Sequence, residues 1–151
     1  EPKLMQRATI FQDFAKRSNI WETAIKGIQA HPLLGEGPLT YFHIYKQYHG
    51  HPTQHAHSIY LDPILSHGII GVILAGIYFA GNLKEVYLLL KRRIDLRLFS
   101  LISAFILTIL IHGILDYTVY WVQTGLLFLI VLSASSMYFH KEQPYDIQEE
   151  H

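Results

Sequence analysis

The stretch HGHPTQHAHSIYLDPILSHGIIG, residues 49–71, joins a polar segment directly to an apolar one. Its first half holds four histidines within nine residues, His49, His51, His55 and His57. From residue 64 to about residue 83 the chain is then almost entirely apolar, long enough to cross the ~30 Å of hydrocarbon in a bilayer. A titratable cluster joined to a membrane helix predicts chemistry at a membrane surface.

The composition of the whole chain also points to a membrane protein. Half of the 151 residues are hydrophobic (50%), 16% are charged, and the mean hydropathy is +0.20. The formal net charge is zero, so no basic excess favours nucleic acid as a partner. The absence of cysteine excludes disulfides, thiolate metal ligands and cysteine nucleophiles.

Hydropathy predicts an all-α, polytopic fold with three transmembrane helices and an outer helical loop region. The three predicted spans cover residues 63–83, 98–115 and 119–139, and a tight turn at 113–118 joins the last two. Asp62 is predicted to be the N-cap of the first span, with a proline at its first helical position.

The loop between the first two spans predicts the orientation of the chain. Four basic residues fall there: Lys91, Arg92, Arg93 and Arg97. The positive-inside rule places them in the cytoplasm. Residues 1–62 and the turn at 113–118 then lie on the extracytoplasmic face, and residues 140–151 form a cytoplasmic tail.

The first residues, Glu1-Pro2-Lys3, lack the pattern of a signal peptide. Export of the outer region would then depend on spans that precede it. We therefore expect the chain to be the C-terminal part of a larger multi-span protein.

The outer region is predicted to contain a short amphipathic helix. Asn19 and Glu22 have the spacing of a capping box, and apolar residues follow at helical intervals. This helix should end before Pro32, since the residue before a proline avoids the helical conformation. Two glycines and two prolines then define a loop at residues 31–38, while residues 39–60 suit either a short helix or irregular chain.

Three interpretations are open for His55 and His57, which are separated by one residue. They can be surface histidines of a polar loop, or zinc ligands in a His-x-His arrangement. Alternatively, a neutral imidazole can act as a general base on an attacking hydroxyl. Spacing alone does not choose among these three.

Arg17 has two interpretations, a solvated arginine or a guanidinium fork that binds a phosphate or pyrophosphate. Lys26 is a second candidate for the same role.

Two further polar positions lie in or beside the predicted spans. His112 and Asp116 are four residues apart, so they can pair with each other on one helix face or serve a function. His67 lies one turn into the first span, where it is expected to face a polar cavity or the interface.

Four motifs carry a resemblance to a known family. In order they are RSNIW (17–21), HPLLGEG (31–37), HAHSIYL (55–61) and GIIG (68–71). Together they resemble the O-antigen ligase and polymerase family of bacterial membrane proteins. The resemblance covers residues 17–71, and the later predicted spans agree with the family only in hydropathy.

The resemblance implies a many-spanned, all-helical glycosyltransferase of the bacterial cytoplasmic (inner) membrane. Such proteins join or extend glycans at the outer face of that membrane, and their donors are sugars on undecaprenyl pyrophosphate. The implied partners are a lipid-linked glycan donor, an acceptor hydroxyl and membrane lipids, with no metal or other cofactor. By resemblance, Arg17 holds the donor pyrophosphate and His57 activates the acceptor hydroxyl.

The sequence departs from the family pattern at two positions. Ser58 replaces the asparagine that usually follows the histidine, which keeps His55 as a second candidate for the base. Ser66 stands where many members carry a glutamate, so the role of that acid is missing or has moved to His67. A further arginine of the family is expected upstream of Glu1.

Two other classes of function remain as alternatives. One is a non-enzymatic transporter or flippase whose histidines bind a ligand or protons, in which transport would depend on His67, His112 or Asp116. The other is a membrane hydrolase with a histidine-rich zinc site, whose activity a chelator would remove.

Overall fold

The computed structural model describes residues 2–139, with side chains from residue 11 onward. The predicted tail at 140–151 lies outside the described residues. Within them the chain is helical and contains no strand, which confirms the predicted all-α class. The elements are α1 (Pro2–Ala30), α2 (Thr40–Ile44), α3 (Leu61–Lys91), α4 (Leu96–His112), η1 (Thr118–Tyr120), α5 (Val122–Ser133) and η2 (Ala134–Tyr138).

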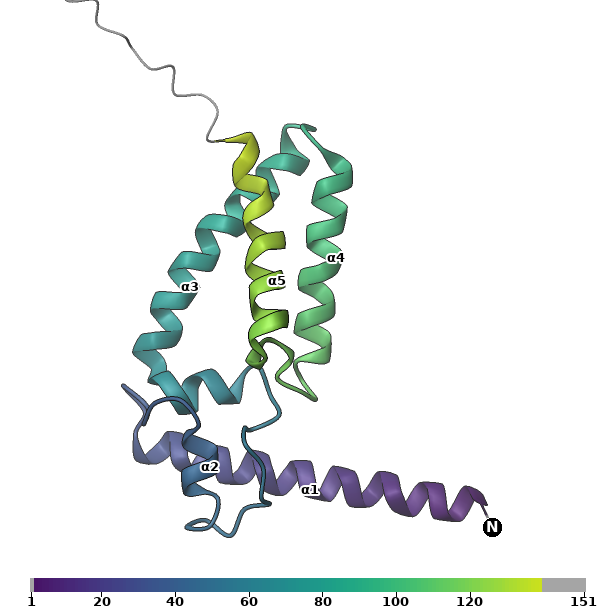
Figure 1. The fold of residues 1–151 in the computed structure, drawn as a ribbon, viewed down its shortest axis with the longest axis vertical. Helices are drawn as coiled ribbons and strands as arrows, with labels where there is room; N and C mark the ends of the chain where they lie inside the picture. The colour runs from purple at the N-terminus through teal and green to yellow at the C-terminus, as the bar shows by residue number, and fades with distance from the viewer. Residues whose placement is uncertain (1, 140–151) are drawn as a thin grey trace, which may run out of the picture.

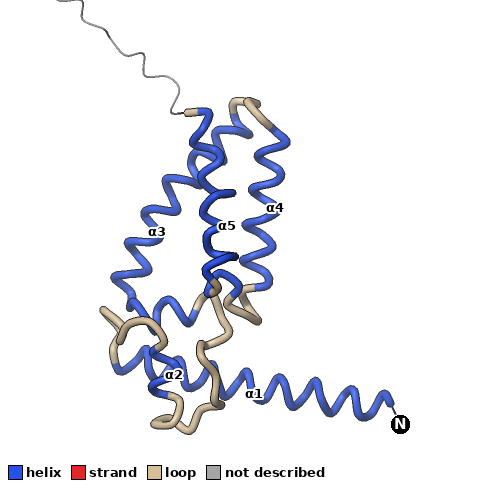
Figure 2. Tube along the Cα trace, viewed as in Figure 1, coloured by secondary structure: helices blue, strands red, loops and turns tan. Residues whose placement is uncertain are grey.

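The helices form two parts that meet near the start of α3. Figure 1 shows α3, α4 and α5 extending lengthwise, with α1 lying crosswise at one end of them. The loops before and after α2 gather at that same end, as the tan segments of Figure 2 show. The loop between α3 and α4 lies at the opposite end.

One helix within residues 2–139, α3, is long and apolar enough to cross a membrane. Helix α4 and the continuous α5–η2 segment are apolar but shorter, so the count of three spans stays a prediction. Many large apolar side chains on these helices face outward, including Ile77 (66% exposed), Ile111 (69%) and Ile130 (67%). An apolar surface of this kind suits contact with lipid.

Helix α1 is longer than the sequence predicts, and the predicted capping box is wrong. Asn19 lies in the middle of α1, where its amide bonds the backbone of the segment between α2 and α3, residues 45–60, called here the histidine-containing loop. It accepts the His51 N–H at 2.6 Å and donates to the His49 carbonyl at 3.4 Å. Glu22 pairs with Lys26 instead of the helix start, at 2.7 Å. The helix does end before Pro32, as predicted.

The start of α3 also differs from the prediction, because Asp62 is not its N-cap. The helix begins two residues earlier than predicted, at Leu61 instead of Pro63. The hydroxyl of Ser58 accepts the N–H groups of Tyr60 (3.3 Å) and Leu61 (3.4 Å), so the serine satisfies donors at the helix start. Asp62 is buried in the first turn, and its carboxylate accepts the Ala56 N–H at 2.7 Å.

Helix α3 is broken at Gly68, which adopts the non-helical angles φ 64° and ψ −176°. Such a break frees backbone groups that need partners. The loop at residues 31–38 supplies them. The Ile69 and Ile70 N–H groups bond the carbonyls of residues 32 and 33, at 2.9 and 3.2 Å. The Ser66 carbonyl in turn accepts the Gly37 N–H at 2.8 Å.

Two apolar clusters hold the parts together. The first packs α1, α2 and the start of α3, and its buried members are Ile20, Ala24, Tyr41, Ile44, Ala56 and Leu65. The second joins the far ends of α3, α4 and α5 through Val86, Leu89, Ile102 and Leu132. Between the clusters lies a cavity of about 560 Å³, walled mostly by apolar residues of α3, α4 and α5.

Candidate active site

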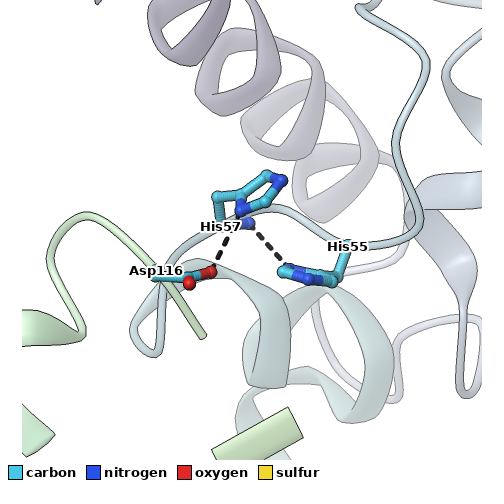
Figure 3. A group of neighbouring side chains, drawn as sticks. All are labelled: His55, His57 and Asp116. Atoms are coloured by element: carbon cyan, nitrogen blue, oxygen red, sulfur yellow. Dashed lines mark hydrogen bonds and ion pairs between the residues drawn. The ribbon is translucent and has the colours of Figure 1, made fainter. Parts of the chain in front are cut away.

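The histidine-containing loop meets the turn after α4, and the contact centres on His57 and Asp116. The Nδ1 atom of His57 lies 3.0 Å from Oδ1 of Asp116, although the residues are 59 positions apart in the chain. Figure 3 shows both side chains together with His55. The His57 N–H donates to Nδ1 of His55 at 3.2 Å, and the two imidazole centroids are 4.3 Å apart.

Backbone contacts fix the position of this loop. The Ile59 N–H bonds the Gly113 carbonyl at 2.9 Å, which ties the loop to the end of α4. The Tyr60 hydroxyl bonds the Leu110 carbonyl, also at 2.9 Å. His57 itself has φ 47°, a left-handed conformation that is uncommon for residues other than glycine and concentrates at functional sites.

The second ring nitrogen of His57 contacts a hydroxyl group. Nε2 lies 3.1 Å from Oγ1 of Thr53, in the same loop. The Asp116 carboxylate therefore occupies one side of the imidazole and an alcohol occupies the other. A ring held in this way can keep one tautomer, with the proton on Nδ1 facing the carboxylate.

The charge states follow from burial and from these contacts. Partial burial would raise the pKa of Asp116, but hydrogen bonds from His57 and from the Tyr117 N–H, with the nearby imidazoles, lower it overall. Burial lowers the pKa of His55, and the neighbouring His57 lowers it further. The site thus combines an ionised carboxylate with a neutral His55 at pH 7.

Arg17 reaches the same place from α1. Its guanidinium donates to the carbonyl of Leu115, the residue before Asp116. The candidate phosphate ligand and the candidate base therefore contact adjacent residues of one turn. A guanidinium has five N–H donors, so one bond to a carbonyl leaves others for an anion.

Three other residues predicted as site members lie apart from this centre. Lys26 pairs with Glu22 on α1, about 13.5 Å along the helix from Arg17. His112 is exposed and does not pair with Asp116, which binds His57 instead. His67 is exposed and lines the cavity between α3, α4 and α5, whose walls are mostly apolar. The polar cavity is therefore not found, and the position of His67 at the membrane interface stays a prediction.

Several contacts of the site were not predicted from the sequence. The Tyr120 ring packs on His55 with centroids 4.6 Å apart, and Tyr117 lies 5.8 Å from Tyr120. Thr53 belongs to no recognisable sequence motif. Asp62 has the sequence pattern of an N-cap, so its buried contact with the loop is not predicted.

These residues define a class of protein: a helical, membrane-associated protein with a paired histidine and carboxylate, and an arginine, at one end of its apolar helices. The comparison with known families agrees. Residues 5–76 match the family described as O-antigen ligase, which confirms the resemblance. Over this stretch, a little under half of its length, the chain is similar to the O-antigen ligase family, whose members are membrane proteins of bacteria. No curated protein and no solved structure matches the chain.

The matched stretch contains Arg17, His55 and His57 but stops before Asp116. The contribution of Asp116 to the candidate site therefore comes from the structure alone.

Proposed function

We propose that the protein takes part in glycan transfer from an undecaprenyl-pyrophosphate-linked donor to an acceptor hydroxyl at the outer face of the cytoplasmic membrane. The observation that carries this proposal is the juxtaposition of Arg17, His57 and Asp116. The guanidinium bonds the carbonyl of Leu115, and the next residue pairs with the imidazole. The match of residues 5–76 to the O-antigen ligase family supports the reaction class.

His57 acts as the general base. Asp116 accepts the Nδ1–H group, so Nε2 keeps a lone pair for the acceptor hydroxyl. The Thr53 hydroxyl, 3.1 Å from Nε2, marks where an alcohol can sit and is displaced or shared when the acceptor arrives. Because His55 is buried and its Nδ1 already accepts the His57 N–H, it is the weaker candidate for the base.

The reaction is a single displacement. The acceptor oxygen forms a bond to the anomeric carbon while its proton moves to Nε2 of His57. The bond from that carbon to the pyrophosphate oxygen breaks, and its electron pair stays with the leaving pyrophosphate. The remaining N–H groups of Arg17 stabilise that charge, so the step uses no metal and inverts the anomeric centre.

The apolar cavity suits the lipid part of the donor. Ile59, Pro63 and Tyr117 line it close to the histidine-containing loop, and it continues between α3 and α5 toward Leu132. A polyprenyl chain in this cavity would hold its pyrophosphate near Arg17. The acceptor would approach His57 from water.

Substitution of two residues tests the proposal. His57→Ala and Arg17→Ala, made in the full-length protein, should each lower the rate of glycan transfer about 100-fold or more. His43→Ala is a matched control, because His43 is exposed on α2 and has no role in the proposed step. Transfer is measured in membranes with equal amounts of each variant. Undiminished transfer by both alanine variants would exclude these roles.

A further inference from the structure

The cluster that holds the proposed base also has the geometry of a metal chelate. One ligand atom from each of His55, His57 and Asp116 lies within 4.8 Å of the others. Two ligands bound tetrahedrally to zinc, each about 2.0–2.1 Å from the ion, lie about 3.3 Å apart. The His57–Asp116 pair is already near that spacing, at 3.0 Å.

We propose that His55, His57 and Asp116 form a binding site for a divalent transition-metal ion, with zinc as the best fit, and that bound zinc inhibits the protein. The inhibition rests on the proposed function, whereas the binding does not. Figure 3 shows the three side chains converging from the histidine-containing loop and the turn after α4.

The donor set selects the kind of metal. Two imidazoles and one carboxylate suit zinc and its neighbours, whereas magnesium and calcium prefer oxygen ligands alone. Three protein ligands leave the fourth tetrahedral position open for water. His57 and Asp116 are partly exposed, with 32% and 41% of their side chains accessible, so an ion can enter from the aqueous side.

The surroundings hold the ligands in place, as the contacts around metal sites usually do. Asp116 accepts the Tyr117 N–H at 2.8 Å, and His55 packs against the Tyr120 ring. The one adjustment concerns His55, whose Nδ1 accepts the His57 N–H. That bond is lost in either mode of binding: Nδ1 binds the ion directly, or the proton moves to Nδ1 and the ring binds the ion through Nε2.

Zinc and the acceptor hydroxyl compete for the same imidazole. An ion between His57 and Asp116 takes the place of the proton on Nδ1. The ring of His57 then carries its proton on Nε2, which has no lone pair left for the acceptor. Occupation by zinc and action as a general base therefore exclude each other.

Zinc binding is tested on the untagged, purified full-length protein in detergent by titration calorimetry with Zn²⁺. Co²⁺ spectra report the coordination geometry. We expect one zinc per chain, with His55→Ala, His57→Ala and Asp116→Ala each weakening the affinity about 10-fold or more. His49→Ala and His51→Ala are matched controls from the same loop and should bind as the wild type does. No stoichiometric zinc in the wild type, unchanged affinity in the Asp116 variant, or loss in both controls would overturn the site.

The inhibition is tested separately by measuring transfer at increasing zinc concentration. Zinc should stop transfer by the wild type, and a chelator should restore it. Stoichiometric binding without inhibition, or loss of transfer on chelation alone, would overturn the inhibitory role. If no variant or condition supports transfer while the three substitutions still weaken zinc binding, the metal site stands and the proposed function fails.

Discussion

At the scale of single residues, the least expected pairing is that of Asp116 with His57. The four-residue spacing of His112 and Asp116 suggested a pair on one helix face. Helix α4 ends at His112, however, and the chain turns, so the carboxylate points to the histidine-containing loop. Sequence patterns can mark His57 through its family motif, but they cannot find a partner 59 residues away.

Replacing Asp116 tests that pairing through the kinetics. Asp116→Asn should lower kcat for transfer by about two orders of magnitude with little change in KM, because an amide no longer favours the required tautomer. His112→Ala should stay within about 2-fold of the wild type, since the His112 side chain is exposed and only its backbone carbonyl, which the substitution keeps, bonds Asp116. Comparable losses of kcat in the Asp116 and His112 variants would instead support the pair that the sequence spacing suggests.

Arg17 is expected to act through the shape of its guanidinium as well as its charge. Arg17→Lys keeps the charge but loses the fork that binds pyrophosphate and the Leu115 carbonyl together. We expect kcat/KM for the donor to fall about 10-fold. Arg93→Lys, in the loop after α3, provides the matched control. Equal kcat/KM for Arg17→Lys and the wild type would show that Arg17 acts through its charge alone.

His55 should make the stability of the protein depend on pH. Its pKa is lowered from 6.5 by burial and then by His57, so below pH 6.5 the unfolded chain binds more protons than the folded one. The free energy of unfolding should therefore decrease as the pH falls from 7 through 6.5. Thermal unfolding of the detergent-solubilised protein measures this decrease, and His55→Gln should reduce it while His43→Gln should not. An identical pH dependence in the His55 variant would contradict the assignment.

At the scale of elements, the sequence indicates where helices lie better than where they break. Long apolar runs predict the helices, and Pro32 correctly limits α1. The break at Gly68 was missed because its partner is a loop more than thirty positions earlier. Glycines inside an apolar run suggest close helix packing, and only the positive φ of Gly68 reveals the break. The extension of α1 through Asn19 also depends on a tertiary contact, with His51.

Gly68→Ala tests the importance of the break. A side chain there would be strained by the positive φ and would collide with the backbone of Leu33. We expect a loss of about 1–3 kcal/mol from the strain, and more from the collision. Gly81→Ala is the control, since a Cβ at Gly81 meets open space and should change stability by less than about 1 kcal/mol. Equal unfolding midpoints for both variants would show that the loop contact is dispensable.

At the scale of the whole molecule, the candidate site and the basic loop lie at opposite ends of α3. After the break at Gly68, residues 69–91 of this helix rise about 35 Å. Figure 1 shows α1 and the loops around it at one end and the α3–α4 connection at the other. The predicted orientation, with the site outside and Arg92 and Arg93 inside, needs this separation.

Single cysteines can test the orientation of this region, because its 151 residues contain none. Gln47→Cys, on the exposed side of the outer loop, should react with a membrane-impermeant maleimide in intact cells. Ile94→Cys, which keeps all four basic residues of the other loop, should react only after permeabilisation. The opposite pattern would place the candidate site in the cytoplasm.

The crosswise position of α1 has a consequence for the choice of donor. If its exposed Phe11 and Phe14, 73% and 63% accessible, rest in the headgroup layer, the helix holds Arg17 at a constant depth. A phosphate anchored by a lipid tail is confined to that same thin layer, whereas a water-soluble sugar nucleotide explores the whole aqueous volume. The protein would then discriminate between the lipid-linked donor and the sugar nucleotide by the depth at which Arg17 is held, before it recognises any sugar.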